Sequence, residues 1–403
     1  MQFALAVIAS AVIILGSPFM GQLQSFLRRS LSTRNYVLLF GVGVMAAVGF
    51  AILIAFFRIR ERRMARFGLL LVAVVFGASY MWAVATPYAE VNAVERVHFV
   101  EYGLIAFLFY RASLSRRRAD PSIIVMPLLA GFMTGTLDEW LQWFIPVRVG
   151  ETHDVLLNLV SIACGLLFAL ALQPPASFTM RLAPASIRNI GLFAAVVWIV
   201  FAAFVSQVHL GYAIDAPGIG RFHSHYTTAG LEALQADRAT RWTTAPPRTL
   251  RRLSREDQYL DEGLWHVRRR NLTDVAEAWR ENLILERYFT PVLDTPTYAS
   301  PEGNRWPAEQ RADLATRAGA VDINFVSAAE PYPLVTWPRA WFWCGAMVIA
   351  ALLAGLPRAL RTDRSRSGRR RYGWRRATAC APRPGCRSYS SRSTPGFAPR
   401  CGR

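Results

Sequence analysis

The chain has 403 residues, of which 53% are apolar, and it carries a formal net charge of +19. Its apolar residues gather in runs of roughly 17–25 residues, the length that a helix needs to cross a bilayer. This composition argues against a purely soluble protein and indicates a polytopic membrane protein.

Eight apolar runs predict eight membrane-spanning helices. QLQSFLRR follows the first run, where a cleaved signal peptide would have small residues, so this run is expected to stay as a helix. The predicted fold class is all-α, a polytopic membrane helix bundle of about eight spans. In chain order the runs cover residues 3–23, 36–57, 67–84, 96–112, 121–144, 153–173, 190–208 and 339–357.

Arginine placement predicts the orientation of these spans. The clusters RIRERRMAR (58–66) and RASLSRRR (111–118), the stretch 173–189 and the arginines after residue 357 all fall on one side of an eight-span bundle. The positive-inside rule makes that side the cytoplasm. RRSLSTR (28–34) falls on the opposite side, which leaves the orientation of the first hairpin open, including a re-entrant one.

A long segment between the seventh and eighth spans has the composition of a soluble domain. Leu260, Leu264 and Val267 recur at helical spacing within it, which predicts one or two amphipathic helices. We therefore expect a small, mostly helical extracytoplasmic domain, in the periplasm of a bacterium. The four tryptophans near the eighth span fit an interfacial belt at the membrane surface. They are Trp306, Trp337, Trp341 and Trp343.

The predicted organisation has six parts. Residues 358–403 hold fourteen arginines and one aspartate without apolar periodicity, which predicts a disordered cytoplasmic tail that contacts anionic lipid. No groove-reading or stacking pattern accompanies this charge, so nucleic acid is not an expected partner. The parts are N-terminal transmembrane helices (1–89), a transmembrane core (90–173), a seventh helix with its preceding loop (174–208), a periplasmic helical domain (209–338), an eighth helix (339–357) and the tail (358–403).

Polar residues interrupt the fourth, fifth and sixth spans at the same predicted depth. Ionisable side chains within membrane segments are candidates for function by default. Because the link IPVRVGETHD is short, the polar ends of the fifth and sixth spans must lie close together near the outer surface. The candidates are Glu95, His98, Glu101 and Tyr102 of the fourth span, Asp138, Glu139 and Gln142 of the fifth, Arg148 of the link, and Asp154 and Asn158 of the sixth.

The sequence ERVHFVEYGLIAFLF followed by LDEWLQWFIPVRVGETHDVLLNLVSIACG resembles the VanZ-like family of integral membrane proteins over about residues 90–173. Glu95 stands where the family usually has Asp, and Ser161 stands where it generally has Gly. The resemblance implies a role in the cell envelope of the bacterial inner membrane. The family's namesake is associated with resistance to the glycopeptide teicoplanin, which makes a link to antibiotic resistance an expectation here.

Two functions compete for the polar cluster. One is a site at the outer leaflet that binds or supports the handling of an envelope or lipid-linked component, with the polar pairs Arg148–Asp154 and His98–Glu139 also joining the helices. The other is a membrane-embedded hydrolase or transferase. Its catalytic candidates are His98 as base or nucleophile, with Glu101, Glu139 and Asp154. Arg148 would hold a phosphate or carboxylate, and the other polar residues would bind substrate.

A transporter is less favoured because the polar residues lie near one surface rather than at the midplane. His98 and Glu101, with Asp154 or Glu139, have a spacing that a metal ion would accept, but a single histidine favours a hydrogen-bonded network. No metal site is therefore predicted, the cofactor is unknown, and the sequence leaves open whether the protein is an enzyme. Membrane lipids and a cell-wall precursor or lipid-linked substrate are the expected partners.

Overall fold

A computed structural model describes most of the chain. The described residues are 1–114, 119–145, 148–242, 258–296, 300–319, 326–328, 332 and 334–355. The arginine-rich tail predicted for residues 358–403 lies outside them, as does part of the basic stretch 111–118.

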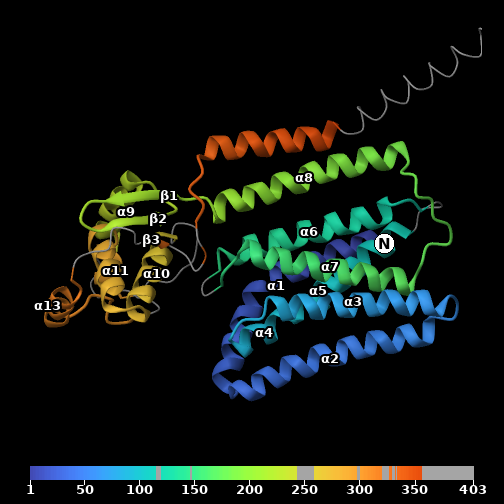
Figure 1. Ribbon diagram of the computed structural model, residues 1–403, viewed down its shortest axis with the longest axis horizontal. Coiled ribbons are helices and arrows are strands. Elements are labelled where there is room, and N and C mark those ends of the chain that lie inside the picture. Colours follow the sequence, from blue (N-terminus) through green and yellow to red (C-terminus); the bar gives the residue numbers. More distant parts are fainter. Residues whose placement is uncertain are drawn as a thin grey trace, which may run out of the picture. The chain divides into compact units, whose positions relative to one another are not determined.

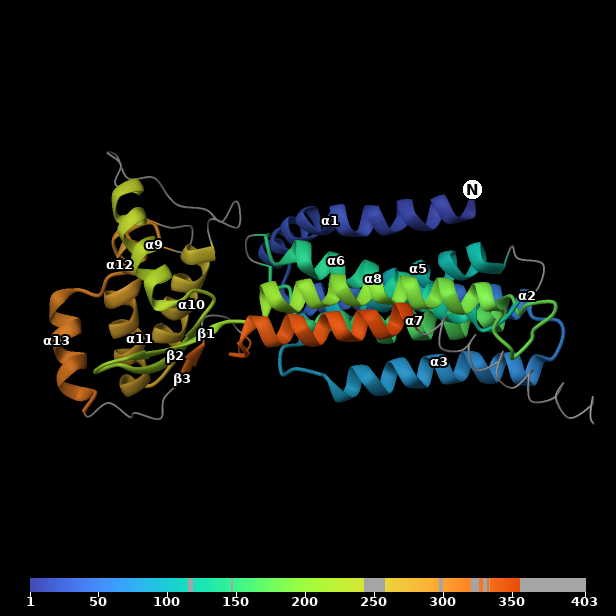
Figure 2. The same cartoon turned by 90° about the horizontal axis from the view of Figure 1, so that it is seen from above.

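The first half of the chain folds into long helices that lie side by side (Figure 1). α5 packs against α6 and α7, while α3 packs on α7, α8 on α6, and α1 on both α5 and α6. Figure 2 shows the same helices from above. Their bounds are α1 Gln2–Ser30, α2 Thr33–Arg58, α3 Arg63–Ala83, α4 Ala89–Glu95, α5 Val97–Leu114, α6 Ser122–Gln142, α7 Thr152–Leu172 and α8 Pro184–Val208.

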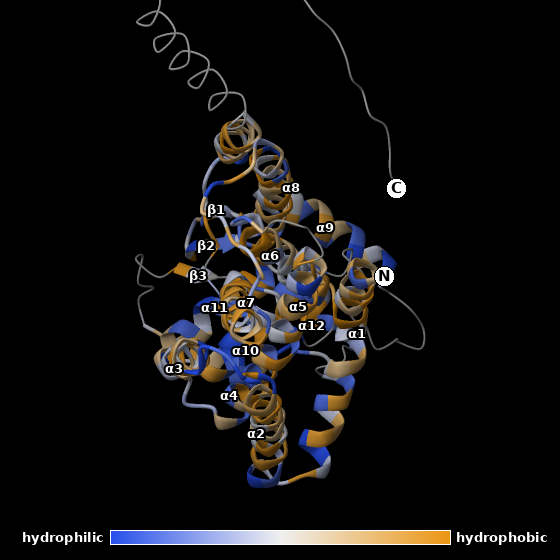
Figure 3. Cartoon of the chain, turned by 90° about the vertical axis from the view of Figure 1, so that its right-hand side faces the viewer, coloured by the Kyte–Doolittle hydropathy of each residue, from blue (hydrophilic) through white to orange (hydrophobic). Residues whose placement is uncertain are grey.

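Five of the described helices are long and apolar enough to cross a membrane, namely α1, α2, α3, α7 and α8. The most apolar 18-residue window of α2 contains no buried residue, so its apolar side chains face outward. Large apolar side chains such as Phe19, Met45 and Phe56 are likewise exposed. Figure 3 colours the chain by hydropathy, and these helices are mostly orange, the colour of hydrophobic residues. Exposed apolar surface of this extent needs a lipid environment.

The other three expected spans are also helices. α5 and α6 are long enough but less apolar. α5 carries His98 and Glu101, and α6 carries Asp138 and Glu139. The eighth expected span is the shorter apolar helix Arg339–Gly355. α1 and α2 contain 29 and 26 residues, so each is long enough to cross a membrane.

The arginine-bearing connections meet at one end of the bundle. Arg66, near the start of α3, donates to the carbonyl oxygens of Ala171 and Leu172 at 2.6 and 2.8 Å, so it caps the C-terminus of α7. Tyr110 of α5 donates to the carbonyl oxygen of Gln173 at 2.7 Å. These contacts agree with the single arginine-rich side that the sequence predicts.

Two glycines allow α5 and α7 to approach closely. A Cβ on Gly165 would lie 2.5 Å from the Cα of Gly103, so no larger residue fits at this crossing without a backbone shift. Small residues serve the same purpose wherever membrane helices pack tightly.

The segment after α8 forms a separate hydrophobic core with its own sheet. β1 (Tyr212–Ala216) and β2 (Gly220–Ser224) form an antiparallel hairpin, and β3 (Val326–Ala328) pairs with β2 in parallel. Gly218, with φ of 78°, occupies the third position of the hairpin turn. The helices are α9 Thr228–Arg241, α10 Gln258–Leu272, α11 Val275–Tyr288, α12 Thr290–Asp294 and α13 Ala308–Arg317.

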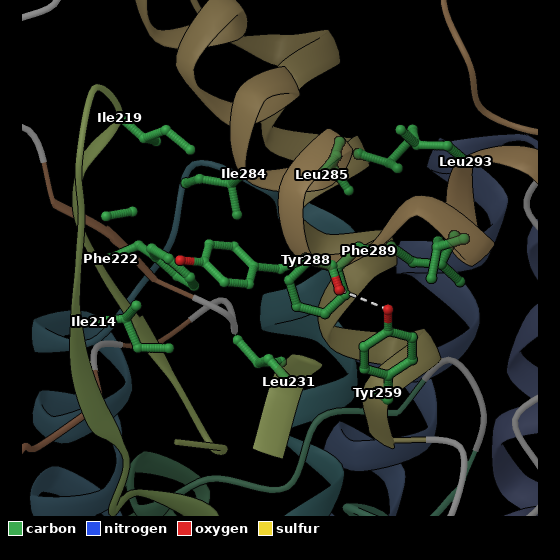
Figure 4. Packing of buried hydrophobic residues seen from close by; sticks show 14 of the residues in the cluster. Ile214, Ile219, Phe222, Leu231, Tyr259, Ile284, Leu285, Tyr288, Phe289 and Leu293 are labelled. Atoms are coloured by element: carbon green, nitrogen blue, oxygen red, sulfur yellow. Dashed lines mark hydrogen bonds between the residues drawn. The ribbon is translucent and has the colours of Figure 1, made fainter. Parts of the chain in front are cut away.

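The prediction of one or two amphipathic helices is confirmed with two, α10 and α11, and Leu260, Leu264 and Val267 are buried. The sheet was not predicted. Its residues pack with α10 and α11 in one core, where Phe222 lies against Tyr288 (Figure 4). Tyr259 donates a hydrogen bond to the carbonyl oxygen of Tyr288 at 2.6 Å.

Candidate binding site in the helix bundle

Asp138 lies at the centre of the polar cluster and joins three helices. Its side chain is 3% exposed. It accepts hydrogen bonds from Ser17 of α1, from the Tyr102 hydroxyl of α5 at 2.8 Å and from Gln142 of its own helix at 3.1 Å. Gln142 follows Asp138 by four residues, which places both on one face of α6. This carboxylate is well supplied with donors.

The neighbouring carboxylate, Glu139, is fully buried but only half satisfied. Its Oε1 accepts from the side-chain amides of Gln142 at 3.1 Å and Asn158 at 3.5 Å. Its Oε2 is buried and has no hydrogen-bond partner among the described residues. The Oδ1 of Asn158 is likewise buried and has no hydrogen-bond partner among the described residues. An unpartnered buried polar atom costs free energy, so each of these two atoms would gain from a further hydrogen bond.

Arg148, in the link between α6 and α7, also belongs to the cluster. Its guanidinium donates to the side-chain oxygens of Gln142 and, at 3.1 Å, Gln24 of α1. Gly150 presses the link against α6, because a Cβ at this position would overlap the carbonyl oxygen of Glu139. A positive group is therefore held beside two buried carboxylates.

His98 and Glu95 lie at the start of this region but outside the hydrogen-bonded network. The His98 ring stacks on Tyr102, with 5.8 Å between ring centroids. The Nδ1 of His98 and the Oε2 of Glu95 are both buried and lack a partner in the described chain. Glu101 is half-buried on the same helix. Like Oε2 of Glu139, these two atoms are buried polar groups whose hydrogen-bonding capacity the described residues do not use.

Asp154 contacts a different residue from the one expected. It forms an ion pair with the adjacent His153 at 3.6 Å. Neither the Arg148–Asp154 pair nor the His98–Glu139 pair occurs among the described residues, because Gln142 and Gln24 bind Arg148 and Tyr102 stacks on His98.

The residues that lie close enough together to hold a metal ion differ from those that the sequence analysis considered. Glu151, His153 and Asp154 each place one ligand atom within 4.8 Å of the others, whereas His98 and Glu101 belong to no such group among the described residues. Burial raises the pKa of Glu151, and the Asp154 charge raises it further. An acidic group of this kind is common without a metal ion, so we assign none.

The sequence analysis missed the residues that α1 contributes. Ser17 and Gln24 bind Asp138 and Arg148, and a Cβ on Gly21 would lie 3.3 Å from Arg148. The signal was present as a small or polar residue at positions 17, 21 and 24, which share one face of a helix. It was overlooked because none of these residues carries a charge.

Comparison with known families covers the helices that form the cluster. Residues 3–173 match the model of the family described as VanZ/LLP1. This segment is VanZ-like. The match confirms the predicted resemblance and extends it from residue 90 back to α1, whose side chains complete the cluster. No curated protein and no solved structure matches the chain.

The VanZ-like segment contains four of the helices that are long and apolar enough to span a bilayer, and α8 follows it. Together these features make the chain a multi-pass membrane protein. All ten predicted site residues lie in this segment. Hydrogen bonds join six of them, namely Tyr102, Asp138, Glu139, Gln142, Arg148 and Asn158.

Proposed function

We propose that the polar cluster of the VanZ-like segment binds the polar head of an envelope component or a lipid-linked component at the outer leaflet. The observation that carries the proposal is the buried Oε2 of Glu139, which lacks a partner in the described chain while Arg148 lies beside the same network. A donor group on a ligand would satisfy Glu139, and an anionic group would pair with Arg148.

The proposal includes the topology that the arginines indicate. Eight spans in the inner membrane of a bacterium would put the cluster at the outer leaflet and residues 209–338 in the periplasm. The meeting of Arg66 with the end of α7 supports this orientation, because it groups arginine-bearing connections at the opposite end from Arg148. Membrane lipids and a cell-wall precursor are then the accessible partners, and a contribution to teicoplanin resistance is part of the same proposal.

Binding fits the geometry better than catalysis by His98. A histidine that acts as a general base has its ring oriented by a second hydrogen bond. The Nδ1 of His98 has no such partner among the described residues, and the ring stacks on Tyr102 instead. A hydrolase or transferase that uses His98 is the alternative, and the same experiment separates the two.

The test compares Glu139→Gln, Arg148→Ala and His98→Ala variants in cells. Membrane accumulation is scored against sensitivity to cell-wall inhibitors, including teicoplanin, with Glu61→Gln as the matched control because Glu61 is exposed and distant in sequence from the cluster. Normal accumulation with lost protection in the Glu139 and Arg148 variants is expected. Full protection in all three variants would reject the site.

His98→Ala distinguishes binding from catalysis. If His98 only lines the site, its alanine variant retains part of the protection, and a lipid-linked precursor still binds to the purified protein. Complete loss of protection with unchanged precursor binding would instead establish the catalytic alternative.

A further inference from the structure

A cavity of about 900 Å³ lies against the domain that follows α8. One face of α10 forms a wall of it, with Asp261, Trp265, Arg268 and Asn271 at helical spacing. The loop from residue 300 to 307 forms a second wall. Gly303, with φ of 87°, makes the turn of this loop, where a side chain would be strained.

Trp306 belongs to this second wall. The guanidinium of the buried Arg270 lies over its ring, 4.6 Å from the centroid. Arg270 also donates to the carbonyl oxygen of Asn304 at 2.7 Å and to Asn282 of α11 at 3.0 Å. Burial lowers the pKa of Arg270 to about 10, so it stays charged at neutral pH. This arginine holds the two walls together.

The wall that α10 forms carries a second arginine, which lies over a second indole ring. Arg268 lies over the Trp265 ring at 4.9 Å, and its side chain is exposed. No carboxylate pairs with Arg268 among the described residues. Arg305, by contrast, lines the cavity but is bound by both oxygens of Asp294. Arg268 is therefore the guanidinium that an incoming anion can reach.

The lining as a whole combines positive charge, indole rings and side-chain amides. It contains four arginines, of which one is Arg148, against a single acid, Asp261. Arginine binds phosphate through two parallel hydrogen bonds. Indole rings offer flat apolar faces, and the amides of Asn271 and Gln310 can both donate to and accept from hydroxyl groups.

We propose that this cavity binds a saccharide that carries a phosphate group. The sugar ring packs on Trp265, the phosphate pairs with Arg268, and Asn271 and Gln310 hydrogen-bond to the hydroxyl groups. Arg270 positions Trp306 and does not itself need to touch the ligand. Apart from Arg148 and Val149, the lining residues belong to the domain, and the contacts proposed here do not use Arg148, so the proposal stands even if the cluster around Glu139 binds nothing.

The experiment is titration calorimetry of the full chain in detergent with N-acetylglucosamine 1-phosphate. Arg268→Ala is expected to weaken binding roughly tenfold or more, since a charge-assisted contact is lost. Trp265→Ala is expected to have a similar effect, while Trp265→Phe preserves an aromatic face and most of the affinity. Arg287→Ala is the matched control, because Arg287 lies over Tyr288 in the same way outside the cavity.

Three other ligands and one variant make the outcome decisive. They are N-acetylglucosamine, inorganic phosphate, uridine monophosphate and Glu139→Gln. N-acetylglucosamine without phosphate and inorganic phosphate are each expected to bind at least roughly tenfold more weakly than the sugar phosphate, since each offers half of the contacts. Glu139→Gln is expected to leave this binding unchanged, which separates the cavity from the bundle site. Absence of binding, equal binding by the Arg268 variant, equal binding of inorganic phosphate or preferred binding of uridine monophosphate would each overturn the proposal.

Discussion

Two buried glutamates of this protein have opposite surroundings. Glu281 of α11 and Glu139 of α6 are both fully buried. Both oxygens of Glu281 are bound, one by the Ser327 hydroxyl at 2.6 Å and the other by the Nδ1 of His266 at 2.7 Å, with Arg269 at 3.6 Å. Glu139 has amide donors on one oxygen and none among the described residues on the other.

This difference separates a carboxylate that is fully bound from one that can still accept a hydrogen bond. A buried charge with every oxygen bound and a cation beside it joins the elements that supply its partners, here α10, α11 and β3. A buried carboxylate oxygen without a donor has lost its hydration and gained no hydrogen bond in return, which costs free energy. A hydrogen bond to that oxygen would reduce the cost. Burial alone therefore does not distinguish the two glutamates, whereas the number of bound oxygens does.

The largest expected effect comes from making the same substitution at both glutamates. Glu281→Gln replaces one acceptor oxygen with a donor that faces Ser327 or His266, so the domain should lose about 2–5 kcal/mol of stability. Glu139→Gln retains the acceptor for Gln142 and Asn158, so its loss should stay below about 1 kcal/mol. Thermal unfolding in detergent measures both variants. Equal losses would remove the distinction between the two sites.

The packing of Gly150 tests how the bundle site keeps its shape. Gly150→Ala puts a methyl group against the carbonyl oxygen of Glu139, which requires the link to move. Overpacking of this kind typically costs about 1–3 kcal/mol. The displaced Arg148 should also weaken function beyond the loss of stability. Gly345→Ala, where a Cβ meets nothing, serves as the control, and identical behaviour of the two variants would contradict the prediction.

Asp120 is a third carboxylate, at the other end of the bundle, and it resembles Glu281 in being fully bound. Burial by itself would raise the pKa of Asp120. Hydrogen bonds from Ser122, Ser186 and the backbone N–H of Ala183 outweigh that effect and lower the pKa to about 2. The bound carboxylate joins the start of α6 to the start of α8.

Asp120→Asn should destabilise the protein by about 1–2 kcal/mol at pH 7, because hydrogen bonds to a charged group are lost. The folded pKa lies below the unfolded value of about 3.9, so the stabilisation is present above that pH and disappears as the pH falls toward 2. The difference in melting temperature between wild type and variant should therefore shrink between pH 5 and pH 3. A difference independent of pH would show that Asp120 acts by packing alone.

The smallest effect is expected at an exposed ion pair of the domain. Arg317 and Asp313 lie one turn apart on α13 at 3.0 Å, with both side chains exposed. Arg317→Ala should change stability by at most a few tenths of a kcal/mol, since water and salt screen such pairs. Chemical unfolding of the full chain checks this value. A loss above about 1 kcal/mol would mean that exposure is a poor guide to the role of a charge in this domain.

Much of the architecture was predictable because hydropathy and helical spacing are local properties. The eight expected spans all lie on helices, and among the described residues five of these helices are long and apolar enough to cross a membrane. The buried face of α10 follows from Leu260, Leu264 and Val267. β3 was not predictable, because its three residues carry no strand pattern and pair with β2 about a hundred positions earlier.

The sequence by itself determined which charged residues α5, α6 and α7 carry, and that those at the end of α6 and the start of α7 lie close together, because a short link joins these two helix ends. Only the tertiary structure decided which of their atoms are satisfied. Ser17 meets Asp138 and Gln24 meets Arg148 across more than 120 residues of chain, so the packing of α1 on α6 selects these pairs. The same packing leaves one oxygen of Glu139 without a donor among the described residues, and no sequence pattern predicts which oxygen lacks one.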